Sequence, residues 1–537
     1  FRALLAAGQV RESVKLLLHT YLGGAYGNEF GGHPDEAGHY VTGLMIRDYL
    51  ASGFHAGPMT YAKDYYDHYP KVALGNWPPL FYLMQSAWTL IFPPNRTSMM
   101  LLMAFLSTLV AMTLFFALKR EFNSRKGFLG ALLFLSLPLF QAQADMLMVE
   151  VPFTLLALIA MVFFGQFLDS KKSVNSFAFG LFAAIAILTK GNGVLLALVP
   201  PLALIFGRQL ALLKRPAFWI PAVVVPIICG PWTWKYRDVT RAGWVADSPT
   251  WSFSRVAIYY YPHKLVLAFG FGLMVLAIIG FWAKIIARRG ERLSGIWPTA
   301  AAVLCSTLIF QIVVPCGWEA RHLFPALPPV ILFIFAGADW VIGRLSAKGL
   351  SPKLAAVSVM TVAGLAFFIQ TFRVTENDFS GFAPVAITLL SNPQTKQSTF
   401  LVSSDARGEG SFISEVAMRE KRPGHIVQRT SKALASSTWG GDKYQTKFAD
   451  EQAIVDFLQK SSFQYLVLDT SLPASARKRH HDLLGEAVLH HPEIFALEGN
   501  YPINRGGVWQ TNGIQLYKLS DERNGAIASE THKALPN

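Results

Sequence analysis

Long apolar stretches are the feature that most limits how this chain can fold. Stretches of roughly 17 to 22 apolar residues recur through the middle of the sequence, which is the length that a helix needs to cross a bilayer. They are continuously apolar rather than alternating, and this favours helices over the strands of a barrel. Only 15% of the residues are charged, whereas a soluble domain carries about 25%. The sequence therefore predicts an α-helical polytopic membrane protein.

The loops between these stretches predict the orientation of the chain. Loops rich in Lys and Arg alternate with loops that contain few, and the rich set is expected in the cytoplasm. We expect residues 98–372 to form a transmembrane domain of about ten spans. These spans are expected near residues 98–118, 127–142, 152–168, 175–188, 192–207, 217–234, 263–287, 297–315, 322–343 and 353–372.

Residues 1–97 are predicted to form a first extracytoplasmic loop. Residues 37–50 have the amphipathic pattern of a helix that lies on a membrane surface. Residues 78–94 are apolar enough to enter the bilayer, but a crossing would move everything before them into the cytoplasm, so we expect a re-entrant segment with both ends outside. Residues 1–20 are too polar to span, and we expect that an initial span is absent from this chain.

The last part of the chain, residues 373–537, is polar and is predicted to be a small soluble α/β domain outside the membrane. Residues 405–410 follow a strand and contain two glycines, but they lack the spacing of a phosphate loop and are interpreted as a turn. Strands are expected at 399–403, 464–469 and 513–518, alternating with helices at 411–420, 450–460 and 474–489.

Charge and cysteine content exclude several classes of function. The net charge of +14 could indicate nucleic acid, but much of it lies in short loops, where membrane orientation explains it, and no nucleic-acid partner is predicted. The three cysteines Cys229, Cys305 and Cys316 form no CxxC pair. They predict neither a disulfide framework nor a metal site.

Asp35 and Glu36 are adjacent acidic residues ahead of the first clear span. A carboxylate just outside a bilayer could take a proton from an acceptor hydroxyl, and two adjacent negative charges would raise the pKa of one of them. The alternative is that the pair simply begins a helix, where acidic side chains are favourable. Both readings stay open.

Further charged residues lie at the outer ends of expected spans. Asp145 and Glu150 could face a cavity, although ordinary solvation of a loop is the alternative. Lys190 could meet a lipid phosphate or extend to bulk headgroups. Arg321 can bind phosphate with two parallel donors. His322 could orient a phosphate or bind a metal, but a lone histidine is more often structural.

Several short motifs stand in one order along about residues 30–345. They are Pro34-Asp35-Glu36-Ala37, Trp77-Pro78-Pro79-Leu80-Phe81-Tyr82, Asp145-Met146-Leu147, Leu188-Thr189-Lys190-Gly191 and Arg321-His322-Leu323-Phe324-Pro325-Ala326-Leu327-Pro328-Pro329. Together they resemble the GT-C membrane glycosyltransferases, in the branch that contains protein O-mannosyltransferases and the bacterial transferase that adds aminoarabinose to lipid A. One departure is Trp77, where the aminoarabinose transferases commonly have lysine; the nearest lysine here is Lys71.

The resemblance implies transfer of a sugar from a polyprenyl-phosphate donor to a glycan, lipid or protein acceptor, outside the bacterial cytoplasmic (inner) membrane. Asp35 would be the general base and Glu36 would hold the acceptor, while Lys190 and Arg321 would meet the donor phosphate. No metal and no cofactor are implied. Membrane lipids are expected partners.

Other residues and other functions remain as alternatives. Trp77 and Tyr82 are candidates for sugar contact, because aromatic faces pack against sugar C–H surfaces, but such rings also anchor loops at an interface. A non-catalytic GT-C-like membrane subunit that scaffolds a larger complex is the second hypothesis. A transporter is less expected, since the acidic residues gather outside the spans rather than at mid-membrane.

Overall fold

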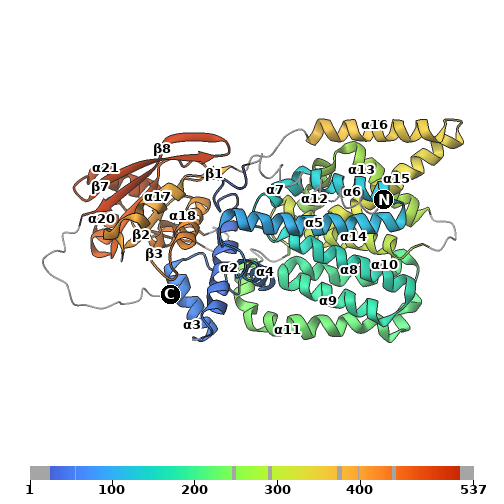
Figure 1. Cartoon of the computed structure of the whole chain (residues 1–537), viewed down its shortest axis with the longest axis horizontal. Helices are drawn as coiled ribbons and strands as arrows, with labels where there is room; N and C mark the ends of the chain where they lie inside the picture. The colour runs from blue at the N-terminus through green and yellow to red at the C-terminus, as the bar shows by residue number, and fades with distance from the viewer. Residues whose placement is uncertain are drawn as a thin grey trace. The chain divides into compact units, whose positions relative to one another are not determined.

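The computed structural model describes residues 24–54, 56–244, 249–287, 293–371, 378–396, 398–437 and 443–520 (Figure 1). The chain divides into two compact units. The helical unit takes its described residues from Phe1–Tyr26 and Ala73–Asn377, and the α/β unit takes them from Gly27–Val72 and Asp378–Asn537. The predicted fold class, a helical membrane protein with a C-terminal domain that contains a sheet, is confirmed.

Within the described residues, the helical unit has five helices long and apolar enough to cross a membrane, and two bent helix pairs also pass when each is taken as one span. The five are α5 (Arg96–Glu121), α8 (Glu150–Ser170), α11 (Pro216–Trp244), α14 (Ile296–Val313) and η4 (Ala320–Ala326) continued by α15 (Leu327–Ala347). The other elements are α4 (Leu80–Thr89), α9 (Ser173–Thr189), η1 (Gly191–Leu198), α10 (Val199–Gly207), η2 (Leu210–Lys214), η3 (Trp282–Ile286) and α16 (Pro352–Thr371).

Two predicted spans are not straight helices. The span expected at 127–142 is α6 (Ser124–Ser136) followed by α7 (Pro138–Ala144), which are bent by 65°. Pro138 cannot continue a helix, and it holds the preceding residue in an extended conformation. The span expected at 263–287 lies across α12 (Trp251–Phe269) and α13 (Phe271–Phe281), which are bent by 112°. The break is at Gly270, whose φ of 83° is readily reached only by glycine.

The segment predicted to be re-entrant, residues 78–94, contains the helix α4. Its 10 residues rise only about 15 Å, which is half of a hydrocarbon core. A helix of this length cannot cross the bilayer, and the expected position in the outer leaflet stays a prediction.

Close helix packing in the helical unit depends on small residues. α5, α8, α9 and α11 form a row in which each packs against the next (Figure 1). Between α13 and α15, a Cβ at Gly280 would overlap the carbonyl oxygen of Phe333, and one at Gly337 would overlap the carbonyl oxygen of Leu276. These two glycines allow the helix backbones to touch, as small residues do in membrane bundles.

The α/β unit is built on a six-stranded sheet with the order β1-β7-β8-β6-β2-β3. β2 is parallel to β3 and β6, while β6, β8, β7 and β1 pair antiparallel. The strands are β1 (Phe379–Ser380), β2 (Thr399–Ser403), β3 (Ile426–Arg429), β6 (Phe463–Asp469), β7 (Phe495–Arg505) and β8 (Val508–Leu519); a separate pair is β4 (Ala435–Ser436) with β5 (Gln445–Thr446).

Helices cover both faces of this sheet. Leu401 and Leu466 point to one face, where they pack against Ile454 of α20 (Glu451–Lys460) and Leu484 of α21 (Arg479–His490). On the other face, Phe412 of α18 packs near Phe382 and Phe400. The helices on this face are α17 (Phe382–Ser391) and α18 (Ala406–Arg419); the remaining helices of the unit are α2 (Glu36–Ala51), α3 (Pro58–His68), η5 (Pro393–Thr395) and α19 (Thr430–Ala433).

The structure revises two interpretations in this unit. The amphipathic stretch 37–50 is helix α2, but its apolar side does not lie open to a bilayer. Tyr40 is buried and stacks on Phe30 with ring centroids 3.9 Å apart, and α2 packs against α18. The interpretation of residues 405–410 as a turn is also wrong. Asp405 caps α18 by accepting a hydrogen bond from the Gly408 amide, and both glycines lie inside the helix.

Candidate functional site

Three predicted charged residues meet in the helical unit, and we call them the Glu150 cluster. Lys190 Nζ donates a hydrogen bond to Glu150 Oε1 over 2.7 Å, and Arg321 Nη1 lies 3.5 Å from the same oxygen. The Glu150 side chain is 1% exposed, while those of Lys190 and Arg321 are 15% and 12% exposed. The acid is therefore sealed in the protein, and both cations reach the surface above it.

Local backbone features place these side chains. Glu150 is the first residue of α8. Lys190 has an extended conformation between α9 and η1, and a glycine at 193 is needed there because a Cβ would press on the backbone of Ile187. Arg321 lies at the start of η4, a few residues after Gly317, whose φ is 93°. All three residues thus stand where helices begin or end.

Polar neighbours support the Glu150 cluster. The Arg321 Nε atom forms an ion pair with Glu319, whose side chain is 40% exposed. His322 is buried at the next position. Glu150 Oε2 is buried, and within the described ranges no group donates a hydrogen bond to it. Both cations carry N–H donors of the kind that a phosphate accepts, and their side chains are 15% and 12% exposed.

The other predicted substrate-binding residues of the helical unit are partly or fully buried. Asp145 is buried after α7, and its backbone carbonyl accepts a hydrogen bond of 2.9 Å from Arg96. Tyr82 lies fully buried in α4. Trp77 is half-buried and forms an isolated bridge with Leu74. Substrate contact by Asp145, Tyr82 and Trp77 stays a prediction, and the burial of Tyr82 leaves its ring little access to a sugar.

Asp35 and Glu36 belong to the α/β unit and differ sharply in environment. Asp35 occupies the N-cap position of α2, is 26% exposed, and has its carboxylate 3.5 Å from His33 Nδ1. Glu36 is completely buried, and its Oε2 accepts a hydrogen bond of 2.9 Å from the Gly32 amide. The predicted helix start is therefore present, and of the two acids Asp35 is the one that solvent reaches.

Lys71 is a neighbour of Asp35 that sequence reasoning noted only as the nearest lysine to the paired prolines. Its Nζ donates to the carbonyl of Ala406 over 3.0 Å and approaches that of Pro34 at 3.5 Å. Burial lowers the pKa of Lys71 to about 8, with Arg429 acting in the same direction and Glu409 and Asp35 opposing it. Only the fold could reveal this site, because the contacts join α18 to the loop before α2.

The predicted site residues thus fall into two sets, one in each unit. The structure brings Glu150, Lys190 and Arg321 together in the helical unit, and it places Asp35 and Glu36 in the α/β unit. In the described part of the chain, no group of three or more His, Cys, Asp or Glu side chains could hold a metal ion.

The bundle of membrane-length helices, together with the sheet-containing unit, defines the GT-C fold of membrane glycosyltransferases. Residues 76–234 match the family model described as dolichyl-phosphate-mannose-protein mannosyltransferase. No curated protein sequence matches the chain. The resemblance to the GT-C branch of protein mannosyltransferases and ArnT is confirmed.

Solved structures with this fold are similar over nearly the whole chain. ArnT from Cupriavidus metallidurans in the apo state matches with a TM-score of 0.60 and 15% identity, covering 96% of this chain and 98% of that one. The same protein bound to undecaprenyl phosphate matches at 0.60 and 14%, covering 97% and 100%. The oligosaccharyltransferase AglB from Archaeoglobus fulgidus, in complex with an inhibitory peptide and a dolichol-phosphate, matches at 0.56 and 11%, covering 96% and 74%.

Proposed function

We propose that this protein is an inverting glycosyltransferase that moves a sugar from a polyprenyl-phosphate donor to an acceptor outside the cytoplasmic membrane. The observation that carries the proposal is the Glu150 cluster, in which two cations share one buried carboxylate at the ends of apolar helices. The fold is shared with ArnT, whose structure was solved with undecaprenyl phosphate. Such a lipid would bring its phosphate to the ends of the spans, where these cations lie.

Lys190 and Arg321 would bind the donor phosphate in this proposal. Their ammonium and guanidinium groups are held in place before any ligand arrives, so little rearrangement is needed when negative charge develops on the leaving phosphate. Their partial exposure lets an anion approach them from the outer side. Glu319 is already paired with Arg321 and is more exposed, so it would move aside when a phosphate binds.

Glu150 takes a different role from the substrate contact expected for it. At 1% exposure it cannot touch a sugar without rearrangement. We assign it instead to positioning, because it holds two like charges side by side that would otherwise repel each other.

Asp35 would act as the general base. It takes the proton from an acceptor hydroxyl, and the oxygen attacks the anomeric carbon on the face opposite the phosphate. The new C–O bond forms as the bond to the phosphate oxygen breaks, and the phosphate leaves with the electron pair, which inverts the anomeric centre. Phosphate is a good leaving group, so no strong general acid is required. Lys71 would help to keep Asp35 ionised, since a nearby positive charge favours the carboxylate.

Two measurements test this proposal. Mass spectrometry of the purified protein should detect a co-purifying polyprenyl-phosphate sugar, whose mass names the donor. Transfer by Asp35→Asn should fall by about a hundredfold or more, without a change in melting temperature. Asp67→Asn is the matched control, because Asp67 is an exposed acid in α3 of the same segment, and it should keep near-normal activity.

The same measurements separate this proposal from the scaffold hypothesis. Near-normal transfer by Asp35→Asn would remove Asp35 as the base. A protein that co-purifies with a stable partner, binds no lipid-linked sugar and shows no transfer would support the non-catalytic subunit instead.

A further inference from the structure

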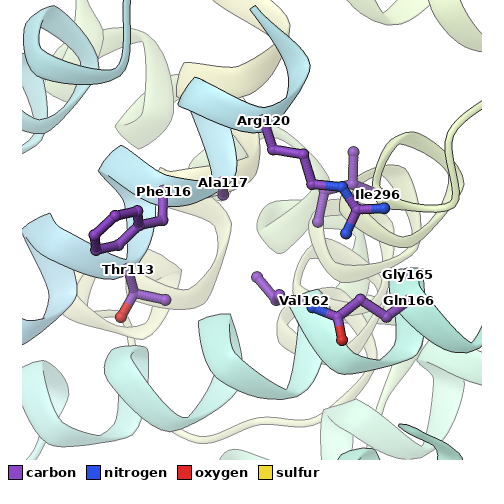
Figure 2. Close-up of a pocket in the computed structure, with 8 residues that line it drawn as sticks. All are labelled: Thr113, Phe116, Ala117, Arg120, Val162, Gly165, Gln166 and Ile296. Atoms are coloured by element: carbon purple, nitrogen blue, oxygen red, sulfur yellow. The ribbon is translucent and has the colours of Figure 1, made fainter. Parts of the chain in front are cut away.

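A second region of the helical unit has the features of a ligand pocket. A cavity of about 290 Å³ lies between α5, α8 and α14 (Figure 2). Arg120 reaches into it from α5, and Gln166 reaches into it from α8. The other lining residues are Thr113, Phe116, Ala117, Val162, Gly165 and Ile296.

This pocket is separate from the Glu150 cluster. Along α8, Glu150 and Gly165 are about four helical turns apart, which corresponds to roughly 22 Å. The two sites therefore lie toward opposite ends of one membrane-length helix. A molecule bound at one end would belong to a different leaflet from a molecule bound at the other.

The pocket is polar at one end and apolar at the other. Arg120 is the second-last residue of α5, whereas Thr113 lies two turns deeper, about 10 Å along the same helix. Between them Phe116 is 53% exposed, so this wall faces the outside of the helix bundle. Val162 continues the apolar wall on α8. A charged head beside Arg120 and an apolar chain toward Thr113 would match this gradient.

The polar groups at the pocket mouth still have donors to offer. Arg120 Nη2 donates to Asp169 over 2.8 Å, but the side chain is 50% exposed and a guanidinium has five donors. The Gln166 side-chain amide makes no hydrogen bond within the described ranges. An anion between these two side chains would satisfy both.

The loops at this end of the helices are rich in positive charge. The last turn of α5 contains Lys119 and Arg120, the first turn of α6 contains Arg125 and Lys126, and the turn after α8 contains Lys171 and Lys172. Two of these cations are paired with acids, Arg120 with Asp169 and Lys126 with Asp339. Basic pockets between helices at such a surface attract anionic headgroups.

We propose that this pocket binds one anionic phospholipid from the leaflet at this end of the helices. The lipid phosphate accepts hydrogen bonds from Arg120 and Gln166, and the first part of an acyl chain lies along Phe116 and Val162. The proposal does not depend on the glycosyltransferase reaction, because none of these residues belongs to the Glu150 cluster.

The first test compares two charge-removing variants of neighbouring residues. The full-length protein is incorporated into vesicles of phosphatidylglycerol and phosphatidylcholine, released in mild detergent, and examined by native mass spectrometry. The wild type should retain one phosphatidylglycerol, and Arg120→Ala should retain about fivefold less. Lys119→Ala removes the same charge from the same last turn of α5, but Lys119 does not line the pocket, so retention should be unchanged. Equal loss of phosphatidylglycerol in the two variants would overturn the proposal, because general attraction of the lipid to a positively charged surface would then explain the retention.

Two further variants separate binding from folding. Val162→Phe fills the apolar end and keeps all charges, and it should also reduce retention. Asp169→Asn frees Arg120 from its partner while keeping an oxygen for the Gly295 amide, so it should raise retention. The proposal fails if phosphatidylcholine is retained equally, if Val162→Phe retains as much lipid as the wild type, or if undecaprenyl phosphate at equal concentration displaces the phospholipid.

Discussion

Replacing Glu150 with glutamine removes the buried negative charge against which Lys190 and Arg321 are held, and it barely changes the shape of the side chain. The amide oxygen can still accept from Lys190, and the amide NH2 takes the place of Oε2, which has no hydrogen-bond partner in the described structure. The substitution therefore isolates the effect of charge. We expect the substitution to lower the stability of the protein and to increase the stabilisation that a bound lipid phosphate provides.

The loss of stability expected for Glu150→Gln follows from the geometry of the ion pairs. At an effective dielectric constant of about 20, the attraction of Glu150 is about 6 kcal/mol at 2.7 Å and about 5 kcal/mol at 3.5 Å, before desolvation is subtracted. Both cationic nitrogens lie within 3.5 Å of one oxygen, so they are at most about 7 Å apart and repel by at least about 2 kcal/mol. Loss of one partner of a buried ion pair commonly costs about 3 to 5 kcal/mol. We expect about 3 kcal/mol, because Glu319 still accompanies Arg321.

The assay is thermal unfolding of the purified protein with and without undecaprenyl phosphate. Glu150→Gln should melt several degrees below the wild type. Added undecaprenyl phosphate should then raise the melting temperature of the variant more than that of the wild type, because its phosphate replaces the missing negative charge. Glu319→Gln is the control. It removes a negative charge from the same arginine, but at a 40% exposed position, where an ion pair contributes only about 0 to 1 kcal/mol.

Either of two results would refute this reasoning. A Glu150→Gln variant that melts with the wild type would show that the buried charge does not hold the two cations. A variant that is destabilised but gains no more from undecaprenyl phosphate than the wild type would show that the phosphate binds elsewhere. The second result would also remove Lys190 and Arg321 from the proposed donor site.

Two further predictions concern packing and pH. Gly280→Ala should destabilise the helical unit, because its Cβ would overlap the carbonyl of Phe333. Gly343→Ala in α15 is the control: its Cβ would meet no atom, so the melting temperature should stay unchanged or rise slightly. Equal melting temperatures of the two variants would contradict the tight α13–α15 contact. Burial, with His481 and Lys478 nearby, lowers the pKa of His480 to about 3 from an ordinary 6.5. Below about pH 6.5 the unfolded chain gains a proton that the folded unit excludes, so the α/β unit should lose stability as pH falls toward 3 and keep it above 6.5. The protection factors of the β6 amides, which correct for the slowing of intrinsic exchange at low pH, should fall over this range, and the fall should be smaller in His480→Gln.

Much of the fold could be predicted from the sequence because each span must satisfy a local condition. A residue that faces lipid must be apolar whatever the distant parts of the chain are. An apolar run of bilayer length, such as 152–168, therefore predicts a membrane helix, which is α8. The strands expected at 399–403 and 464–469 are β2 and β6 for a similar reason, since fully buried strands are short continuous apolar runs. Breaks such as that at Gly270 were missed, because a glycine in an apolar run is common in straight membrane helices as well.

The candidate site was predicted only as a set of residue types in order. Asp35, Lys190 and Arg321 could be named from motifs, but nothing local distinguishes the partly exposed Asp35 from the buried Glu36 beside it. Their difference arises from the Gly32 amide, which donates a hydrogen bond to the Glu36 carboxylate, and from the packing of α2 on α18. An amphipathic pattern indicates that one face of a helix contacts an apolar partner, but it does not indicate whether that partner is lipid or protein.

The sequence by itself determined that this is a helical membrane protein with a polar C-terminal part, because hydrophobicity adds up along the chain. Only the tertiary structure decided that Glu150 and Lys190, 40 positions apart, share a hydrogen bond, and that Arg321 joins them. Coulomb energy depends on distances of a few ångströms, and those distances exist only once the ends of α8, α9 and η4 have come together.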